Sequence, residues 1–235
     1  MTITTHGLSD VGKRRHNNED AFYADDSRHL YAVADGLGGL EAGEEASALA
    51  VSVIREQAEA ASKAGSQVDL VFAVSEAHRA VCRLNRELGP GRDSGTTLTV
   101  LLLLKESCVV AHVGDSALYR FRADSWEKLT TDHTEAEELR RRRPGTRVPE
   151  RFEHTLTRCL GQFVKLEIDH YYYPVAPGDR LLLCTDGLTR HITPDELGGE
   201  IFAADDPESF LKKMIQLSNE RGGSDNATGV ALFLS

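Results

Sequence analysis

Four aspartates of this 235-residue chain stand where an apolar, strand-like run meets glycine. They are Asp35, Asp115, Asp186 and Asp225, in the segments YAVADG, AHVGDS, LLLCTDG and GGSDNATGV. An acidic pair, Glu19 and Asp20, comes just before a further strand-like stretch. A single Asp-Gly pair predicts no more than a turn, because both residue types suit turn geometry. Turn geometry alone does not explain why the pattern recurs at four strand ends.

A shared cation would explain why so many carboxylates stand at strand ends. Buried or half-buried carboxylates repel one another and destabilise the fold unless a positive charge neutralises them. Oxygen ligands without a histidine cluster favour Mg²⁺ or Mn²⁺ over zinc. The nine histidines form neither an H-E-x-x-H nor an H-x-H motif. The residue pattern therefore predicts a magnesium or manganese site.

The charge balance argues against nucleic acid and membrane as partners. The chain carries 27 basic and 37 acidic side chains, a net charge of −10, whereas nucleic-acid binding relies on basic surface. The longest apolar run, Leu98 to Leu104, has the length of a strand and is too short to cross a bilayer. We expect no contact with either.

Cysteine usage indicates a reducing compartment. Cys82, Cys108, Cys159 and Cys184 lie far apart, so the sequence suggests neither a disulfide framework nor a cysteine zinc site. The N-terminus lacks the basic start and apolar core of a secretory signal. We therefore expect a cytoplasmic protein.

The elements that must position the aspartates alternate between strands and helices. Apolar residues at helical spacing predict helices over 43–61 and 68–88, and Thr193 and Asp206 suit the N-caps of two more. The polar segment 131–154 reads as a short helix followed by an irregular surface excursion, since prolines interrupt it. Without a repeat or linker, residues 1–235 are expected to form a single domain with much strand and about four helices.

Eight segments, in chain order, resemble the motifs of the metal-dependent protein serine/threonine phosphatases of the PP2C type, the PPM family. They are SDVGKRRHNNEDAF, VADGLGGLEAGEEAS, GTTLTVLLL, AHVGDS, LTTDHT, HTLTRCLG, LLLCTDGL and GGSDNATGVAL, and the resemblance covers nearly the whole chain, Ser9 to Leu234. Each motif is weak alone, but their order is specific, and the match looks closest to the compact bacterial members. The resemblance implies an α+β fold, a four-layer α-β-β-α sandwich of two mainly antiparallel sheets flanked by helices.

The resemblance also implies a role for each acidic residue. Asp35 would bridge two Mn²⁺ or Mg²⁺ ions in each subunit, and Asp186 and Asp225 would complete the protein ligands of the first ion. The second ion would be held by the Gly36 carbonyl and, partly through water, by Glu19 and Asp20. Asp115, with help from Asp186, would match a third, weaker metal position.

Such a site would hydrolyse phosphoserine or phosphothreonine directly. A hydroxide that bridges the two metals would attack phosphorus, and Arg15, four residues before Glu19, would grip the phosphate. Leu37 stands where some relatives keep a histidine that protonates the leaving group. The general acid would then be a metal-bound water or, as a weaker candidate, His133.

Three questions about function stay open in the sequence. The run Arg140 to Arg143 is either the solvated end of a helix or part of a flap that attracts acidic substrates. A cognate Ser/Thr kinase and its targets are the expected partners of a monomeric enzyme. The alternatives are a catalytically weak PP2C-like sensor or binding module, and a phosphatase of anti-sigma-factor antagonists.

Overall fold

Two five-stranded antiparallel sheets form the centre of the computed structural model, which describes residues 1–37, 42–89, 94–123 and 125–235. Part of the glycine-rich motif after Asp35 therefore lies outside the described residues. The first sheet, called here the β1 sheet, has the order β1 (Ile3–Asp10), β10 (Ala227–Leu234), β9 (Arg180–Cys184), β6 (Ala117–Arg122) and β7 (Ser125–Lys128). The second, the β2 sheet, has the order β2 (Asp20–Asp25), β3 (Leu30–Asp35), β4 (Leu98–Leu103), β5 (Ser107–Val113) and β8 (Asp169–Pro174).

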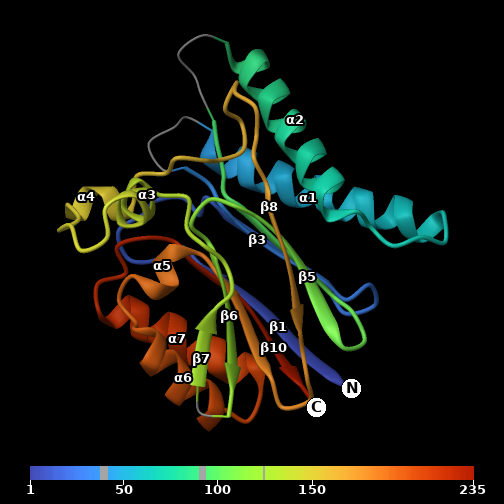
Figure 1. Ribbon diagram of the computed structural model, residues 1–235, viewed down its shortest axis with the longest axis vertical. Helices are drawn as coiled ribbons and strands as arrows, with labels where there is room; N and C mark the ends of the chain where they lie inside the picture. The colour runs from blue at the N-terminus through green and yellow to red at the C-terminus, as the bar shows by residue number, and fades with distance from the viewer. Residues whose placement is uncertain (38–41, 90–93, 124) are drawn as a thin grey trace.

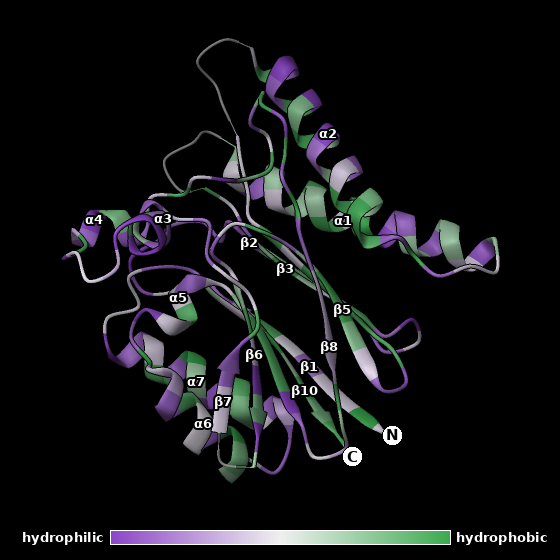
Figure 2. Cartoon of the chain, viewed as in Figure 1, coloured by the Kyte–Doolittle hydropathy of each residue, from purple (hydrophilic) through white to green (hydrophobic). Residues whose placement is uncertain are grey.

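The inner faces of the two sheets share one apolar core. Tyr31 and Leu101 of the β2 sheet and Leu183 and Val230 of the β1 sheet are fully buried in it. Strands such as β5 and β10 are mostly hydrophobic along their length (Figure 2), because both of their faces are covered. The sheets therefore pack face to face.

Helices cover the outer face of each sheet, which gives the four layers α-β-β-α (Figure 1). Helices α1 (Gly43–Lys63) and α2 (Leu70–Leu88) share a core with the β2 sheet. Helices α6 (Pro194–Ala203) and α7 (Pro207–Glu220) do the same for the β1 sheet. Three short helices complete the described elements: α3 (Glu135–Arg142), α4 (Glu150–Glu153) and α5 (Asp186–Thr189). The expected fold class is confirmed.

Local sequence signals placed the helix starts well. Thr193 caps α6 in a complete capping box with Glu196, and Asp206 accepts a hydrogen bond from the Ser209 N–H at the start of α7, as predicted. The estimate of about four helices fits the long ones but missed α4 and α5. Strand β7 was not predicted either, because its four residues, SWEK, are largely exposed and carry no alternating apolar pattern.

Candidate metal centre

Strand register brings three of the four aspartates to one end of the β1 sheet. The antiparallel β6–β9 pairing aligns Ala117 with Cys184, so Asp115, just before β6, meets Asp186, just after β9. Strand β10 pairs with β9 on its other side, which places Asp225, just before β10, beside Asp186. In an antiparallel sheet the start of one strand lies next to the end of its neighbour. Asp186 thus becomes the neighbour of Asp115, 71 positions before it, and of Asp225, 39 positions after it.

The β2 sheet contributes the remaining acidic residues at the same end of the sandwich. Asp20, at the start of β2, is the direct pairing partner of Asp35, at the end of β3. The Gly36 N–H donates to the Glu19 carbonyl at 3.0 Å and extends this pairing by one residue. The Thr185 hydroxyl donates to Asp20 Oδ2 at 2.8 Å and links the two sheets. The predicted ligands therefore gather from both sheets.

The gathered carboxylates are electrostatically strained. Burial, followed by the charges of Asp20, Asp186 and Asp115, raises the pKa of Asp35 well above its usual range. Burial also raises the pKa values of Asp20 and Asp115 to about 7, with a further contribution from Asp186 in each case. Asp20 Oδ1 is buried without a hydrogen-bond partner among the described residues. A buried carboxylate oxygen without a hydrogen-bond partner is suited to hold a cation.

Two arginines neutralise the outer part of the cluster. Arg15 Nη2 lies 2.8 Å from Asp225 Oδ1, and Arg15 Nη1 lies 3.6 Å from Glu19 Oε2. Arg190 bridges Asp186 at 2.5 Å and Asp225 at 3.1 Å. Burial acts to raise the pKa of Asp186, but hydrogen bonding and the nearby positive charge of Arg190 bring it below its usual value. The Arg15 side chain is 36% exposed, so it stands at the rim of the cluster.

The residues present fit hard divalent cations. All the predicted side-chain ligands are carboxylates, whose oxygens are the ligands that Mg²⁺ and Mn²⁺ prefer. In the described parts of the chain, no three His, Cys, Asp or Glu side chains already converge as a finished ligand set. Asp186 and Asp225 are instead both paired with the Arg190 guanidinium. Binding of a metal would have to displace that guanidinium.

Two glycines permit the close packing of the cluster. A Cβ at Gly36 would lie 2.5 Å from the Glu19 carbonyl oxygen, and one at Gly187 would collide with the Asn226 carbonyl oxygen. The glycine beside a metal-site aspartate therefore has a steric reason at Asp35 and at Asp186. A turn alone would not require it at these two places.

The candidate general acids are placed differently. Leu37 is half-buried beside Gly95 and offers no proton donor. His133 is buried, and its Nδ1 accepts from the Gly114 N–H at 3.0 Å. Its Nε2 lies 3.3 Å from Asp169, so both ring nitrogens are engaged. Burial lowers the pKa of His133, helped by the charge of Arg158. This geometry suits a residue that positions the loop before Asp115 better than a proton donor to substrate.

The arginine run of 140–143 lies at the exposed C-terminal end of α3. Arg140 pairs with Glu153 of α4, and Arg142 pairs with Glu138 at 2.7 Å. Part of the positive charge is therefore compensated within the excursion. Whether this segment acts as a flap stays a prediction.

Sequence reasoning missed two residues of the cluster. Arg190 follows Asp186 by four positions, a spacing that places both on one helical face and could have drawn attention to it. His154 lies 3.3 Å from Asp186 Oδ2, and this hydrogen bond raises the pKa of the imidazole. It belongs to the irregular excursion, where spacing carries no geometric signal.

Comparison with known proteins identifies the family of this chain. A family model described as Protein phosphatase 2C matches residues 12–231. Protein phosphatase PhpP of Streptococcus pneumoniae is 32% identical over 94% of this chain and 93% of its own.

Two solved structures are similar over nearly the whole chain. The PPM Ser-Thr phosphatase MsPP of Mycobacterium smegmatis, in complex with cacodylate, has a TM-score of 0.87 and 34% identity, with 99% of this chain and 98% of its own covered. The catalytic domain of the phosphatase PstP, in complex with two manganese ions, has a TM-score of 0.83 and 28% identity, with 99% of both chains covered. This chain therefore belongs to the protein phosphatase 2C family and is a metal-dependent protein serine/threonine phosphatase of the bacterial type.

Proposed function

We propose that the protein hydrolyses phosphoserine and phosphothreonine in other proteins, using water activated between two Mn²⁺ or Mg²⁺ ions. When bound, the two ions supply a strong nucleophile at neutral pH and stabilise charge on the phosphoryl oxygens. The observation that carries the proposal is the crowding of acidic residues from both sheets around Asp35, with Asp20 Oδ1 left unpartnered. A third, weaker ion at Asp115 is part of the proposal.

Distinct roles follow for the protein residues from their positions. Asp35 lies between the acidic residues of the two sheets and is suited to contact both ions. Asp186 and Asp225 on one side, and the Gly36 carbonyl with Glu19 and Asp20 on the other, complete the proposed ligands. Thr185 orients Asp20 through its hydroxyl hydrogen bond.

Arg15 is proposed to bind the substrate phosphate. Its guanidinium already sits beside Asp225 at the rim of the cluster and remains partly exposed. The planar fork of a guanidinium matches two phosphoryl oxygens at once. The relatives described as serine/threonine phosphatases point to protein substrates, and a cognate Ser/Thr kinase with its targets is the proposed partner set of a monomeric enzyme. Targets such as anti-sigma-factor antagonists fall within the same proposal.

A cytoplasmic location completes the proposal. All four cysteines are buried and free of disulfides, as a reducing compartment favours. Among the described residues, no helix combines the length and apolar character that a membrane span requires.

The test is manganese-dependent release of phosphate from a phosphothreonine peptide. We expect activity that EDTA abolishes and that Asp186→Asn removes, while Asp205→Asn, at an exposed position before α7, leaves it unchanged. Activity that survives both EDTA and Asp186→Asn would contradict the metal mechanism. A well-folded wild-type protein without activity would favour the alternative, a PP2C-like sensor or binding module.

A further inference from the structure

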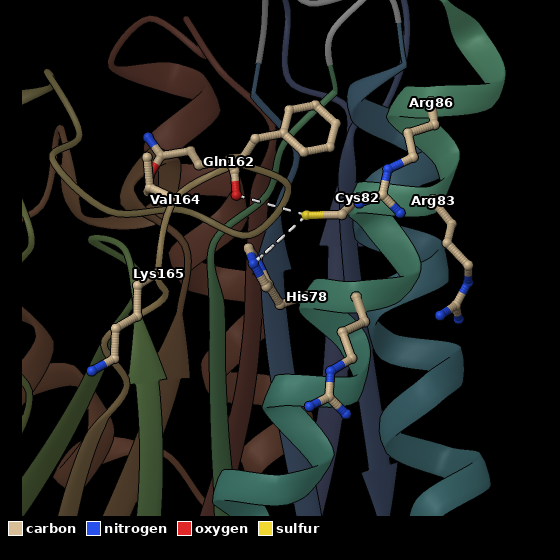
Figure 3. Close-up of a pocket in the computed structure, with 9 residues that line it drawn as sticks. His78, Cys82, Arg83, Arg86, Gln162, Val164 and Lys165 are labelled. Atoms are coloured by element: carbon tan, nitrogen blue, oxygen red, sulfur yellow. Dashed lines mark hydrogen bonds between the residues drawn. The ribbon is translucent and has the colours of Figure 1, made fainter.

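A basic cavity lies outside the metal centre, between α2 and the segment 162–165 (Figure 3). Its volume is about 470 Å³, and its lining includes Arg79, Arg83, Arg86 and Lys165. None of the described residues that line it is acidic. A protein with a net charge of −10 thus concentrates four positive side chains in one place.

The cations are held on a regular support. Arg79, Arg83 and Arg86 recur at intervals of four and three residues, which places them on one face of α2. All three are exposed, as is Lys165 across the cavity. Arg79 also pairs with Glu76 on the same helix. The arrangement presents positive charge to solvent along about two helical turns.

Apolar side chains stand beside these charges. Phe163 is 59% exposed and Val164 is 65% exposed, an unusual pair of neighbouring hydrophobic residues on the surface. The Arg86 guanidinium lies 5.5 Å from the Phe163 ring centroid. Cys82 Sγ contacts the Gln162 carbonyl oxygen at 3.7 Å, which attaches the segment to α2. The cations of the cavity can therefore contact the charged end of a bound acidic side chain, while the apolar residues contact its hydrocarbon stem.

A second cavity adjoins the basic cavity at the segment 162–164. It has a volume of about 560 Å³ and shares Gln162, Phe163 and Val164 with the basic cavity. At its other side it is lined by Leu37, the residue that follows Gly36. The two adjoining cavities are called here the groove, and their lining residues extend from Leu37, next to Gly36 of the proposed second metal position, to the arginines of α2.

We propose that this groove binds an acidic segment of the phosphoprotein substrate while the phosphorylated residue lies at the metal centre. The inference rests on the proposed function, and it adds a preference for substrates with Asp or Glu at some distance from the phosphorylation site. Complementary charge raises the local concentration of such a segment and its association rate. Because the charges are exposed, salt weakens the effect.

The test compares pairs of phosphothreonine peptides, and the two members of each pair differ only in having a Glu-rich or a Gln-rich flank. Successive pairs place this flank at increasing spacing from the phosphate, on either side of it. The variant is Arg83→Glu with Lys165→Glu, one change on each side of the cavity. Lys105→Glu, a single exposed charge reversal in the turn between β4 and β5, is the control for charge reversal elsewhere on the surface. Hydrolysis of a small aryl phosphate reports the metal centre alone.

We expect the double variant to lose about tenfold in kcat/KM for the Glu-rich peptide at low salt, mainly through KM. Activity toward the Gln-rich peptide and the aryl phosphate should stay within about twofold of wild type, as should all activities of the control variant. Equal losses on all three substrates, or a preference for the Glu-rich peptide that survives in the double variant, would overturn the proposal.

Other outcomes separate this inference from the proposed function. A wild-type protein that prefers neither peptide would overturn the groove proposal. If that protein still hydrolyses the aryl phosphate, the proposed phosphatase function is supported. The wild-type protein could also show no peptide preference while a nucleotide alters its aryl phosphate hydrolysis but not that of the double variant. That result would assign the groove to small polyanions and would also overturn the groove proposal. Failure of wild type on every substrate would instead contradict the proposed function.

Discussion

An aspartate lies just beyond each end of strand β9, and the two differ in how their charge is compensated. Asp179, before the strand, is 1% exposed, and its carboxylate oxygens accept hydrogen bonds from Arg122 at 2.5 and 2.6 Å. Its Oδ2 also accepts from the Ala176 N–H at 2.9 Å. Asp186, after the strand, shares its arginine with Asp225 and faces a crowd of further carboxylates.

Asp179 is a structural carboxylate, whereas Asp186 is a proposed metal ligand. The Asp179 pair is complete within the protein, since a bidentate guanidinium satisfies both oxygens. At the other end, Arg15 and Arg190 serve a cluster that also holds Asp20, Asp35 and Asp115. Excess negative charge persists only where something else is expected to bind, because burial of unbalanced charge destabilises the fold.

The largest expected effect is on catalysis at the Asp186 end. Asp186→Asn should lower kcat/KM for a phosphopeptide about a thousandfold, because a lost metal ligand removes several kcal/mol of transition-state stabilisation. The free energy of unfolding of the metal-free protein should fall by less than in Asp179→Asn, because relief of repulsion with the other carboxylates partly offsets the lost ion pair with Arg190. Steady-state kinetics and urea unfolding check the two parts, and a large loss of stability would erase the contrast with Asp179.

The reverse outcome is expected at the other end of the strand. Asp179→Asn should lower the free energy of unfolding by about 2 kcal/mol, because it removes charge-assisted hydrogen bonds to Arg122. Activity of the folded protein should match wild type. Urea unfolding measures the first effect, and kinetics well below the unfolding midpoint measure the second. A catalytic defect in this variant would show that the two ends of β9 are coupled.

The pH dependence of stability sharpens the comparison further. Burial and like charge raise the folded-state pKa of Asp20 from 3.8 to about 7, so its protonated form is favoured in the fold. Stability associated with this group is therefore fully present below about pH 4 and is lost as pH rises toward 7. Relative to wild type, metal-free Asp20→Asn should gain at least about 1.4 kcal/mol between pH 4 and 7, the equivalent of one pKa unit.

That gain should disappear when metal is bound. Saturating Mn²⁺ neutralises the cluster and stabilises the ionised wild type, so wild type should then be the more stable protein at pH 7. Thermal unfolding with Mn²⁺ and with EDTA separates the two conditions. If the variant gains nothing in EDTA, the cluster is already neutralised without metal.

The smallest effect concerns the arginine that occupies the cluster. Arg190→Gln should tighten Mn²⁺ binding about threefold to tenfold, since the metal no longer displaces a guanidinium from Asp186 and Asp225. Titration calorimetry measures this directly. Lys212→Gln, which removes an exposed ion pair with Glu208 on α7, serves as control. Weaker binding in Arg190→Gln would mean that the arginine preorganises the carboxylates for the metal.

Much of the fold could be predicted because local signals agreed with the tertiary structure. The helix start at Thr193 and the apolar strand after Asp225 follow from capping and hydropathy, and eight motifs in order identified the sandwich. Strand β7 could not be predicted, since it is defined by its pairing with β6 rather than by its own residues.

The candidate site was predictable as a set of residues but not as an arrangement. The sequence identifies Asp35, Asp115, Asp186 and Asp225, and the structure brings them together; their ligation of metal stays a prediction. The Arg190–Asp186 pair follows from a spacing of four residues, but the contacts of Arg190 with Asp225 and of His154 with Asp186 join distant segments, which no spacing reveals. The groove beside α2 likewise exists only once the segment 162–165 has packed against the helix.

The hydrogen bond from Thr185 to Asp20 crosses from one sheet to the other and joins residues 165 positions apart. Neither sheet alone assembles the proposed ligands, so the cluster forms only when the sheets have docked. We expect this contact to form late in folding, because closing so long a loop costs chain entropy before its contacts form. An ion that binds there would add little to the folding rate but would slow unfolding, since it stabilises contacts absent from the transition state. The concentration of metal would then control the lifetime of the native state through the unfolding rate, and would have little influence on the folding rate.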